Sequence, residues 1–371
     1  MIDFREARWF GVERAQGYSR VLAVAFVPTF VYFYLQAMGP TGSDFRVFWS
    51  SAKLALSGAP EAVYPAFLNP PPFLLVLLPV GFLSYPVAWL AWVTATYAVW
   101  LLVARRLIPN ATWPIAVFPG AMIAAWHGQN GLLTAALFIG AILSLRSARP
   151  VLAGALLGAM IIKPHLALLV PIALIAGREW RAFVAAAVSA VSLLLLSWLV
   201  FGSAAFVGFF DSVAYSTYIL RPTHDGSTAD FYLRMPTIYA GLRPIAGASI
   251  AIAVQAAAAL TMAFLVYCVW SRSDDALGKG SMLVVATCLS VPYLFHYDLA
   301  VLILPICWLV REAMRVGFYP WERALIAVFY WSPFLVRAFA PPLNFNFMPL
   351  IFLALLWAVL RRLAAQSVDG G

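Results

Sequence analysis

Long apolar runs separated by short charged turns constrain the fold of this chain more than any other feature. Residues 21–38 ("VLAVAFVPTFVYFYLQAM") and 181–201 ("RAFVAAAVSAVSLLLLSWLVF") are each close to the roughly 20 residues with which a helix crosses a bilayer. Only 11% of the residues are charged and the mean hydropathy is +0.89, so the chain has too little charge to cover a soluble core. The sequence therefore predicts an all-α polytopic membrane protein.

The number and orientation of the crossings follow from the charges. The apolar runs, among them 113–126, 165–176 and 322–340, predict about twelve transmembrane helices, although several are shorter than a perpendicular helix needs. Residues 1–20 carry both signs of charge without a cleavage site and are expected to stay in the cytoplasm. Alternate crossings then place most of the 24 Lys and Arg residues inside, as the positive-inside rule requires. We expect an integral cytoplasmic (inner) membrane protein of a bacterium with both termini cytoplasmic.

One stretch interrupts this alternation. Residues 69–84, "NPPPFLLVLLPVGFLS", look like another crossing, but counting it would move most of the arginines outside. We therefore predict a short re-entrant or surface-lying helix there, opened by the proline run. No linker divides the chain, so residues 1–371 are expected to form a single integral membrane domain with extracytoplasmic loops at 39–85 and 202–247, which contain helices.

Several classes of function lack their motifs. The formal net charge of +9 is explained by cytoplasmic loops, so no nucleic acid is expected as a partner. The three cysteines lie inside apolar runs without ligand spacing. The sequence has no Gly-rich phosphate loop, no HExxH or CxxC pair and no Gly-x-Ser-x-Gly elbow. Nucleotide hydrolysis, zinc proteolysis and serine hydrolysis therefore have no support, and no metal or other cofactor is expected.

The polar residues that lie between apolar runs gather on the predicted outer side. Lys163 and Asp298 are among them, and an unpaired ion in such a place is costly. All four histidines are also there: His127, His165, His224 and His296. This clustering predicts an extracytoplasmic site.

Asp44, directly after the first apolar run, has two interpretations. It could cap a helix that starts at Phe45, since Asp favours that position. It could also be a base that takes a proton, with its pKa raised by partial desolvation. The two roles could coexist if backbone amides orient the carboxylate before a substrate arrives.

The other candidates also have structural alternatives. Lys163 could snorkel to the headgroups or, beside Pro164, meet a phosphate at a helix break. His127 and Gln129 could satisfy a tight turn or face a site. The pair His296 and Asp298 can point into one cavity only from an irregular backbone.

The second outer loop adds two basic candidates. Arg221 and Arg234 lie in "RPTHDGSTADFYLRMP", a segment that could order over a bound lipid or remain a solvated connection. We expect these two arginines to contact substrate.

Four stretches together resemble glycosyltransferase family eighty-seven, whose members are polyprenyl-phosphate-sugar-dependent enzymes of the C-type membrane fold (GT-C) and include alpha-mannosyltransferases of lipid glycans. The stretches are spread over about residues 40–310: "SDFRVFWSSAKLALSGAPEAVYP" followed by "NPPPFLLVLLPVGFL", "HGQNGLL", "GALLGAMIIKPHLALL" and "FHYDLAVLILP". The resemblance implies a GT-C-like fold that transfers a hexose, with mannose as the first candidate, to a lipid-linked or cell-envelope glycan. The partners would be the polyprenyl-phosphate sugar donor, this acceptor and membrane lipids.

The resemblance also implies roles for individual residues. Asp44 matches the acidic base of the first outer loop, and transfer by direct displacement would invert the sugar. The residues implied for binding the donor phosphate are Lys163, His165 and His296, and the "HGQN" turn with His127 and Gln129 matches a family motif that we expect to contact substrate. Asp298, Arg221 and Arg234 are further expected substrate contacts that rest on their positions in the sequence and not on the resemblance. The competing prediction is a transporter or flippase of a polar or lipid-linked substrate, which would more often show internal repeats.

Overall fold

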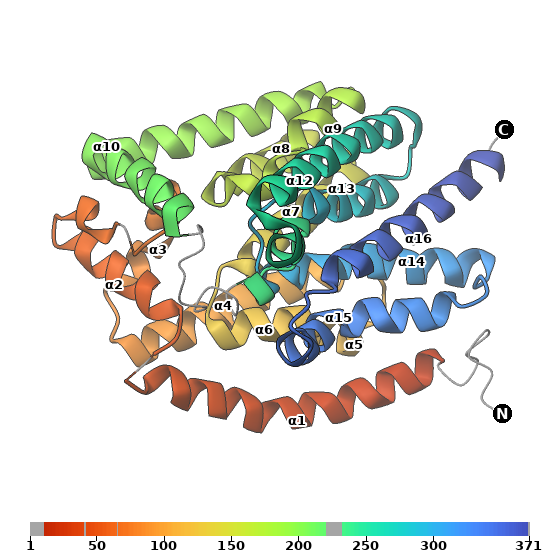
Figure 1. Ribbon diagram of the computed structural model, residues 1–371, viewed down its shortest axis with the longest axis horizontal. Helices are drawn as coiled ribbons and strands as arrows, with labels where there is room; N and C mark the ends of the chain where they lie inside the picture. Colours follow the sequence, from red (N-terminus) through yellow and green to blue (C-terminus); the bar gives the residue numbers. More distant parts are fainter. Residues whose placement is uncertain (1–10, 41, 65, 220–231, 370–371) are drawn as a thin grey trace.

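The computed structural model describes residues 11–40, 42–64, 66–219 and 232–369, and within these ranges the chain contains helices and no β-strand (Figure 1). The helices are α1 (Val12–Met38), α2 (Phe45–Leu56), η1 (Pro60–Val63), α3 (Pro71–Gly81), α4 (Tyr85–Ala104), α5 (Thr112–Ala116), α6 (Pro119–His127), α7 (Gly131–Arg146), α8 (Pro150–Gly158), η2 (Ala159–Ile162), η3 (Pro164–Ala167), α9 (Val170–Ala176), α10 (Trp180–Ile219), α12 (Ile238–Arg272), α13 (Ala276–Ser290), η4 (His296–Leu302), α14 (Ile303–Val316), α15 (Glu322–Leu343) and α16 (Met348–Asp369). α1 begins inside the predicted N-terminal segment 1–20, whose first ten residues lie outside the described ranges.

Six of these helices are long and apolar enough to span a membrane, so the predicted count of about twelve is not confirmed. The six lie within α1, α4, α10, α12, α15 and α16. Other apolar runs form shorter helices because proline breaks them, as Pro119 does at the start of α6 and Pro164 between η2 and η3. Apolar runs of that length are typical of helices buried in protein.

The short helices α6, α7 and α13 form the interior of the molecule. Every side chain of α13 from Leu277 to Ser290 is buried, and α7 packs on α4, α8, α13 and η4. The long helices α1 and α10 lie at opposite edges, and only 6% of the apolar window in each is buried (Figure 1). An apolar helix that the protein leaves uncovered is suited to contact with lipid.

Close helix packing in this apolar protein depends on glycine. Gly154 and Gly158 form a GxxxG pair on α8 that faces α10. A Cβ at Gly154 would lie 2.1 Å from the carbonyl oxygen of Ala182, and one at Gly158 would lie 2.3 Å from that of Ala186. Helices inside a membrane gain little from hydrophobic burial, so this close backbone contact supplies the packing energy.

Both predicted outer loops contain helices. Residues 69–84 contain α3 (Pro71–Gly81), whose 11 residues span about 16 Å and are too short to cross a bilayer. In the second loop, α10 and α12 each change direction at a glycine in the left-handed region: Gly202 has φ 73° and Gly247 has φ 79°. These kinks lie at the two ends of the predicted loop 202–247, whose described part is helical apart from residues 234–237.

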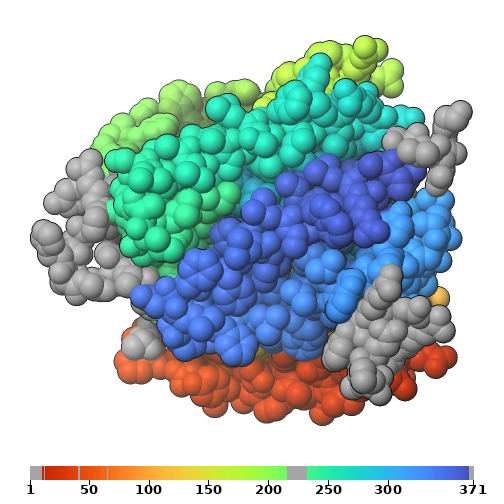
Figure 2. Space-filling model, turned by 45° about the vertical axis from the view of Figure 1, so that its right-hand side comes forward, coloured from red at the N-terminus to blue at the C-terminus, as the bar shows by residue number. Residues whose placement is uncertain are grey.

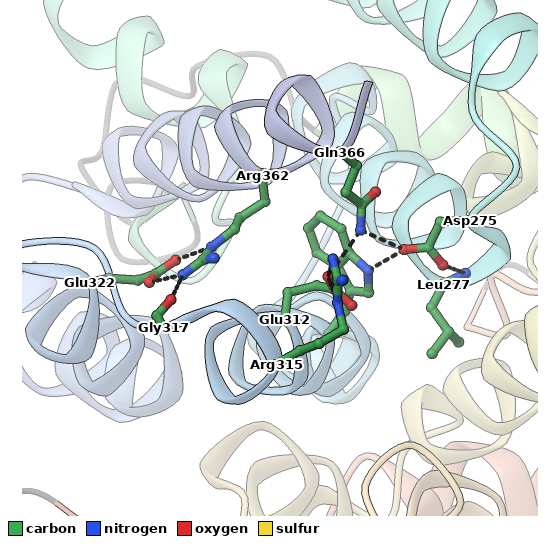
Figure 3. Close-up of polar contacts among 9 residues, drawn as sticks. Asp275, Leu277, Glu312, Arg315, Gly317, Glu322, Arg362 and Gln366 are labelled. Carbon is green, nitrogen blue, oxygen red and sulfur yellow. Dashed lines mark hydrogen bonds and ion pairs between the residues drawn. The ribbon is translucent and has the colours of Figure 1, made fainter. Parts of the chain in front are cut away.

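Polar contacts attach α16 to the rest of the molecule (Figure 3). Arg362 is ion-paired with Glu322 of α15, and both side chains are buried. Gln366 donates hydrogen bonds to Asp275 and, at 3.0 Å, to Glu312. In a largely apolar bundle these bonds fix the position of α16 along its axis.

Candidate active site

A cavity of about 350 Å³ brings together residues from helices far apart in the sequence. Seven of the predicted site residues line it: Asp44, His127, Gln129, Lys163, His165, Arg234 and His296. Asp298 lies behind the wall, where it is 2% exposed. Arg221 and His224 lie outside the described residues. The structure therefore gathers most of the predicted site, while the role of each residue stays a prediction.

Asp44 precedes α2, but its side chain does not cap the helix. The carboxylate makes no hydrogen bond to the amides of the first turn. Its Oδ2 accepts a hydrogen bond of 3.1 Å from Nε2 of Gln129 and lies 3.5 Å from Nδ1 of His127. The expectation that backbone amides orient Asp44 is therefore wrong, because two side chains of the "HGQN" turn do so instead. The Asp44 side chain remains 49% exposed toward the cavity.

A glycine allows this approach. α6 ends at His127, and Gly128 adopts the left-handed conformation with φ 62°, which turns the chain so that His127 and Gln129 both reach Asp44. A Cβ at Gly128 would lie 2.7 Å from Cβ of Phe45. The fully buried Phe45 ring packs on Tyr85 and Trp92, which holds the start of α2 against this turn.

The surroundings lower the pKa of Asp44 below 3.8. Burial is the largest single influence and raises the pKa. The hydrogen bond and charge of His127, the hydrogen bond from Gln129 and the charge of Arg234 lower it and together outweigh burial. The expected rise in pKa is therefore wrong in direction. Asp44 is ionised at neutral pH and can accept a proton.

Lys163 lies at the break between η2 and η3 and is paired inside the protein. Its ammonium forms a buried ion pair with Asp298 and donates a hydrogen bond of 3.1 Å to Asn130 Oδ1. It also lies 5.1 Å from the centre of the Tyr297 ring. Asn130 in turn donates a 3.0 Å hydrogen bond to Asn69. The ammonium is thus largely neutralised by Asp298 although it borders the cavity.

Asp298 fixes the start of η4. Its Oδ2 accepts a hydrogen bond of 3.2 Å from the backbone amide of Phe295, and its Oδ1 accepts from Lys163. His296 and Asp298 lie in a continuous 3₁₀ helix and not on the irregular backbone that would point both side chains into one cavity, and the two side chains have different surroundings. His296 borders the cavity, whereas Asp298 holds Lys163 and the backbone of η4 in place.

Replacing Gly131 with alanine is expected to disturb η4 and lower activity. A Cβ at Gly131 would lie 1.8 Å from the carbonyl oxygen of Tyr297, so η4 must shift and carry His296 with it. The cost should be about 2 kcal/mol or more in stability, because backbone must move. Thermal unfolding in detergent measures this. Gly140→Ala on the same helix is the control, since its nearest neighbour is a side-chain methyl group of Leu156 at 3.3 Å; equal effects of the two variants would contradict the prediction.

The imidazoles of His165 and His296 are neutral in the ligand-free protein. Burial lowers the pKa of each to about 3, helped by Lys163 for His165 and by Arg337, His127 and Arg234 for His296. The buried Nε2 of each ring has no hydrogen-bond partner in the described part of the chain. Both rings are therefore neutral groups with an unused hydrogen-bonding nitrogen, and their role in holding the donor phosphate stays a prediction.

The low pKa of His296 predicts a loss of stability in acid. An unfolded histidine gains its proton near pH 6.5, whereas folded His296 does so near pH 3. Between these values the unfolded state binds more protons, so stability falls as the pH drops from about 6.5 toward 3. We expect the melting temperature to follow this trend and His296→Gln to reduce its slope. An unchanged slope in the variant would contradict the assignment.

The sequence did not identify all of the lining. Arg337 of α15 borders the cavity, and its charge acts on His296 together with that of Arg234. A basic residue late in the apolar run 322–340 was the available signal. Tyr293 and Tyr297, which resemble interfacial anchors in the sequence, also line the cavity.

No group of three or more His, Cys, Asp or Glu side chains is placed to hold a metal ion among the residues that the structure describes. The expected absence of a metal and of any other cofactor stays a prediction.

Comparison with known proteins identifies the family. The family model described as glycosyltransferase family 87 matches residues 67–292, more than half of the chain. No curated protein and no solved structure matches the chain. The matched segment includes His127, Gln129, Lys163 and His165, whereas Asp44 and His296 lie on either side of it. The sequence-based identification of the family is thus confirmed: the chain belongs to glycosyltransferase family 87 and is a membrane glycosyltransferase.

Proposed function

We propose that this glycosyltransferase moves a hexose from a polyprenyl-phosphate sugar to a lipid-linked or cell-envelope glycan, with inversion at the anomeric carbon. Mannose is the first candidate for the hexose. The observation that carries the proposal is the ionised carboxylate of Asp44, which faces a cavity also lined by Arg234 and Arg337. A base beside several positive groups suits a reaction whose leaving group is a phosphate.

Asp44 would act as the general base. Its carboxylate removes the proton from an acceptor hydroxyl while that oxygen attacks the anomeric carbon. The bond between the anomeric carbon and the phosphate oxygen breaks on the opposite face, and its electron pair stays with the phosphate. The proton ends on Asp44 and the added negative charge on the polyprenyl phosphate. His127 and Gln129 keep the carboxylate in one orientation throughout.

Groups on other helices would stabilise the leaving phosphate. Arg234 and Arg337 supply positive charge at the cavity, and His165 and His296 supply unused hydrogen-bonding nitrogens. A phosphate bound by Arg234 would also remove part of the field that lowers the pKa of Asp44, and so make the carboxylate a stronger base when the donor is present. Lys163 lines the same cavity and would add a hydrogen bond to the phosphate, while Asp298 offsets much of its charge.

The membrane supplies the setting for this chemistry. The uncovered apolar faces of α1 and α10 support surrounding lipid as a partner, and the positive-inside rule supports an extracytoplasmic cavity in the inner membrane of a bacterium. Both substrates would then meet the site from the outer leaflet.

Reconstitution tests the proposal. The protein is placed in liposomes with radiolabelled polyprenyl-phosphate sugars and an extract of lipid glycans, and transfer to lipid is measured for each sugar. We expect transfer that stops when the donor is omitted. A nucleotide sugar that serves as the direct donor in purified liposomes would refute the proposed donor.

A further inference from the structure

A second cavity, larger than that of the candidate active site, lies apart from it. It is a groove of about 760 Å³ between the first half of α1, the segment around α5, and helices α14 and α15. Its lining is mainly apolar and includes Leu22, Ile115, Ile306, Ala327 and Trp331. α1 runs along the edge of the molecule below α15 and α16 (Figure 1), and Figure 2 shows its red atoms along the bottom, below the blue C-terminal part of the chain.

Three polar side chains of this groove donate hydrogen bonds within the protein. Gln16 donates a 3.0 Å hydrogen bond to the carbonyl oxygen of Asn110, and Ser19 donates one of 2.7 Å to Ala15. The hydroxyl of Tyr330 donates a 2.8 Å hydrogen bond to the carbonyl oxygen of Pro114. A polar ligand would therefore find few partners, and the groove is suited to hydrocarbon.

An aromatic seam connects the groove to the candidate active site. α15 carries Trp331 in the groove and Arg337 in the site cavity, six residues or about 9 Å apart. Between them Phe334 stacks on Trp126 of α6 at 5.4 Å and meets Phe26 of α1 at 6.2 Å. The surface joining the two cavities thus consists of flat, apolar side chains.

We propose that the groove holds the polyprenyl chain of the donor, which runs from a phosphate at Arg337 along the seam of α1, α6 and α15. This inference rests on the proposed function for the identity of the donor. A chain that leaves the bilayer gains little from hydrophobic transfer, because lipid is already apolar. Binding of the chain therefore depends on close contact with the groove wall. A larger side chain that fills the groove removes these contacts and must weaken the binding.

A kinetic experiment compares two donors that differ only in chain length. Ala327 lines the groove at about 15 Å along α15 from Arg337, too far for a donor with a geranyl-length chain to reach. We expect Ala327→Trp to raise the ratio of KM for the full-length donor to KM for the short donor by about tenfold, through lost contacts. Val328→Trp is the matched control, since Val328 is 41% exposed and does not line the groove. An unchanged ratio in Ala327→Trp would overturn the inference.

A binding experiment separates this inference from the proposed function. Photoreactive polyprenyl phosphate, which has no sugar to transfer, is crosslinked to the protein in liposomes and the labelled peptides are identified. We expect label in residues 15–22 and 326–331, and less of it in Ala327→Trp than in Val328→Trp. Label that spreads equally over α10 would overturn the groove, as would equal labelling of the groove by a photoreactive phospholipid. Specific labelling without any sugar transfer would keep the groove and refute the donor reaction alone.

Discussion

Asp44→Asn is expected to lower kcat for sugar transfer by about a thousandfold, the contribution of a positioned general base. Asparagine has nearly the same shape and still offers Gln129 an oxygen acceptor at the place of Oδ2. It cannot take a proton from the acceptor hydroxyl. Because the substrates keep most of their contacts, KM should change much less than kcat. Transfer in liposomes at saturating donor measures the effect.

The matched control for this variant is Asp211→Asn, which changes an exposed carboxylate of α10 outside the cavity. We expect full activity for Asp211→Asn and equal melting temperatures for both variants. If Asp44→Asn transfers sugar as fast as the control, Asp44 is not the base. The carboxylate would then have a structural role in holding the "HGQN" turn.

Removing either partner of the buried ion pair is expected to cost about 3–5 kcal/mol in the free energy of unfolding. Lys163 and Asp298 have side chains that are 7% and 1% exposed, so a lone partner would keep an uncompensated charge. Lys163→Met and Asp298→Asn should both melt well below the parent protein. The double variant Lys163→Met with Asp298→Leu removes both charges and should recover most of the loss.

An exposed ion pair serves as the control and shows whether the loss of stability comes from burial of the charges or from the loss of any ion pair. Arg315 is paired with Glu312 at 2.9 Å, but the Arg315 side chain is 58% exposed, so Arg315→Ala should cost about 1 kcal/mol or less. An equal loss in Arg315→Ala and Lys163→Met would contradict the argument. If the recovered double variant also binds donor normally, Lys163 positions η4 without holding the phosphate.

The sequence predicts the helices of this protein better than their relation to the membrane. Each predicted apolar run contains helix, because a helix satisfies its own backbone hydrogen bonds in apolar surroundings. The count of about twelve crossings rested on runs such as 113–126 and 165–176, which the structure breaks into pieces. Hydropathy shows that a segment is apolar, but it does not distinguish a segment buried in protein from one that faces lipid. Single prolines, in addition, decide how long each helix is.

The residues of the candidate site could be predicted better than the contacts between them. Ionisable residues between apolar runs are rare and costly, so His127, Lys163 and His296 stood out and indeed border one cavity. Their pairing could not be predicted, because it depends on which turns meet in space. Asp298 was expected at the substrate and instead neutralises Lys163, and Arg337 was overlooked because one arginine in an apolar helix resembles a topology signal.

The left-handed turn at Gly128 has a consequence for how substrates bind. Folding brings Gln129 and His127 to the carboxylate of Asp44 and restricts its rotation before any ligand enters. The entropy lost by ordering the base therefore belongs to folding and not to association. A substrate that binds in this cavity therefore does not have to offset the entropy of ordering Asp44.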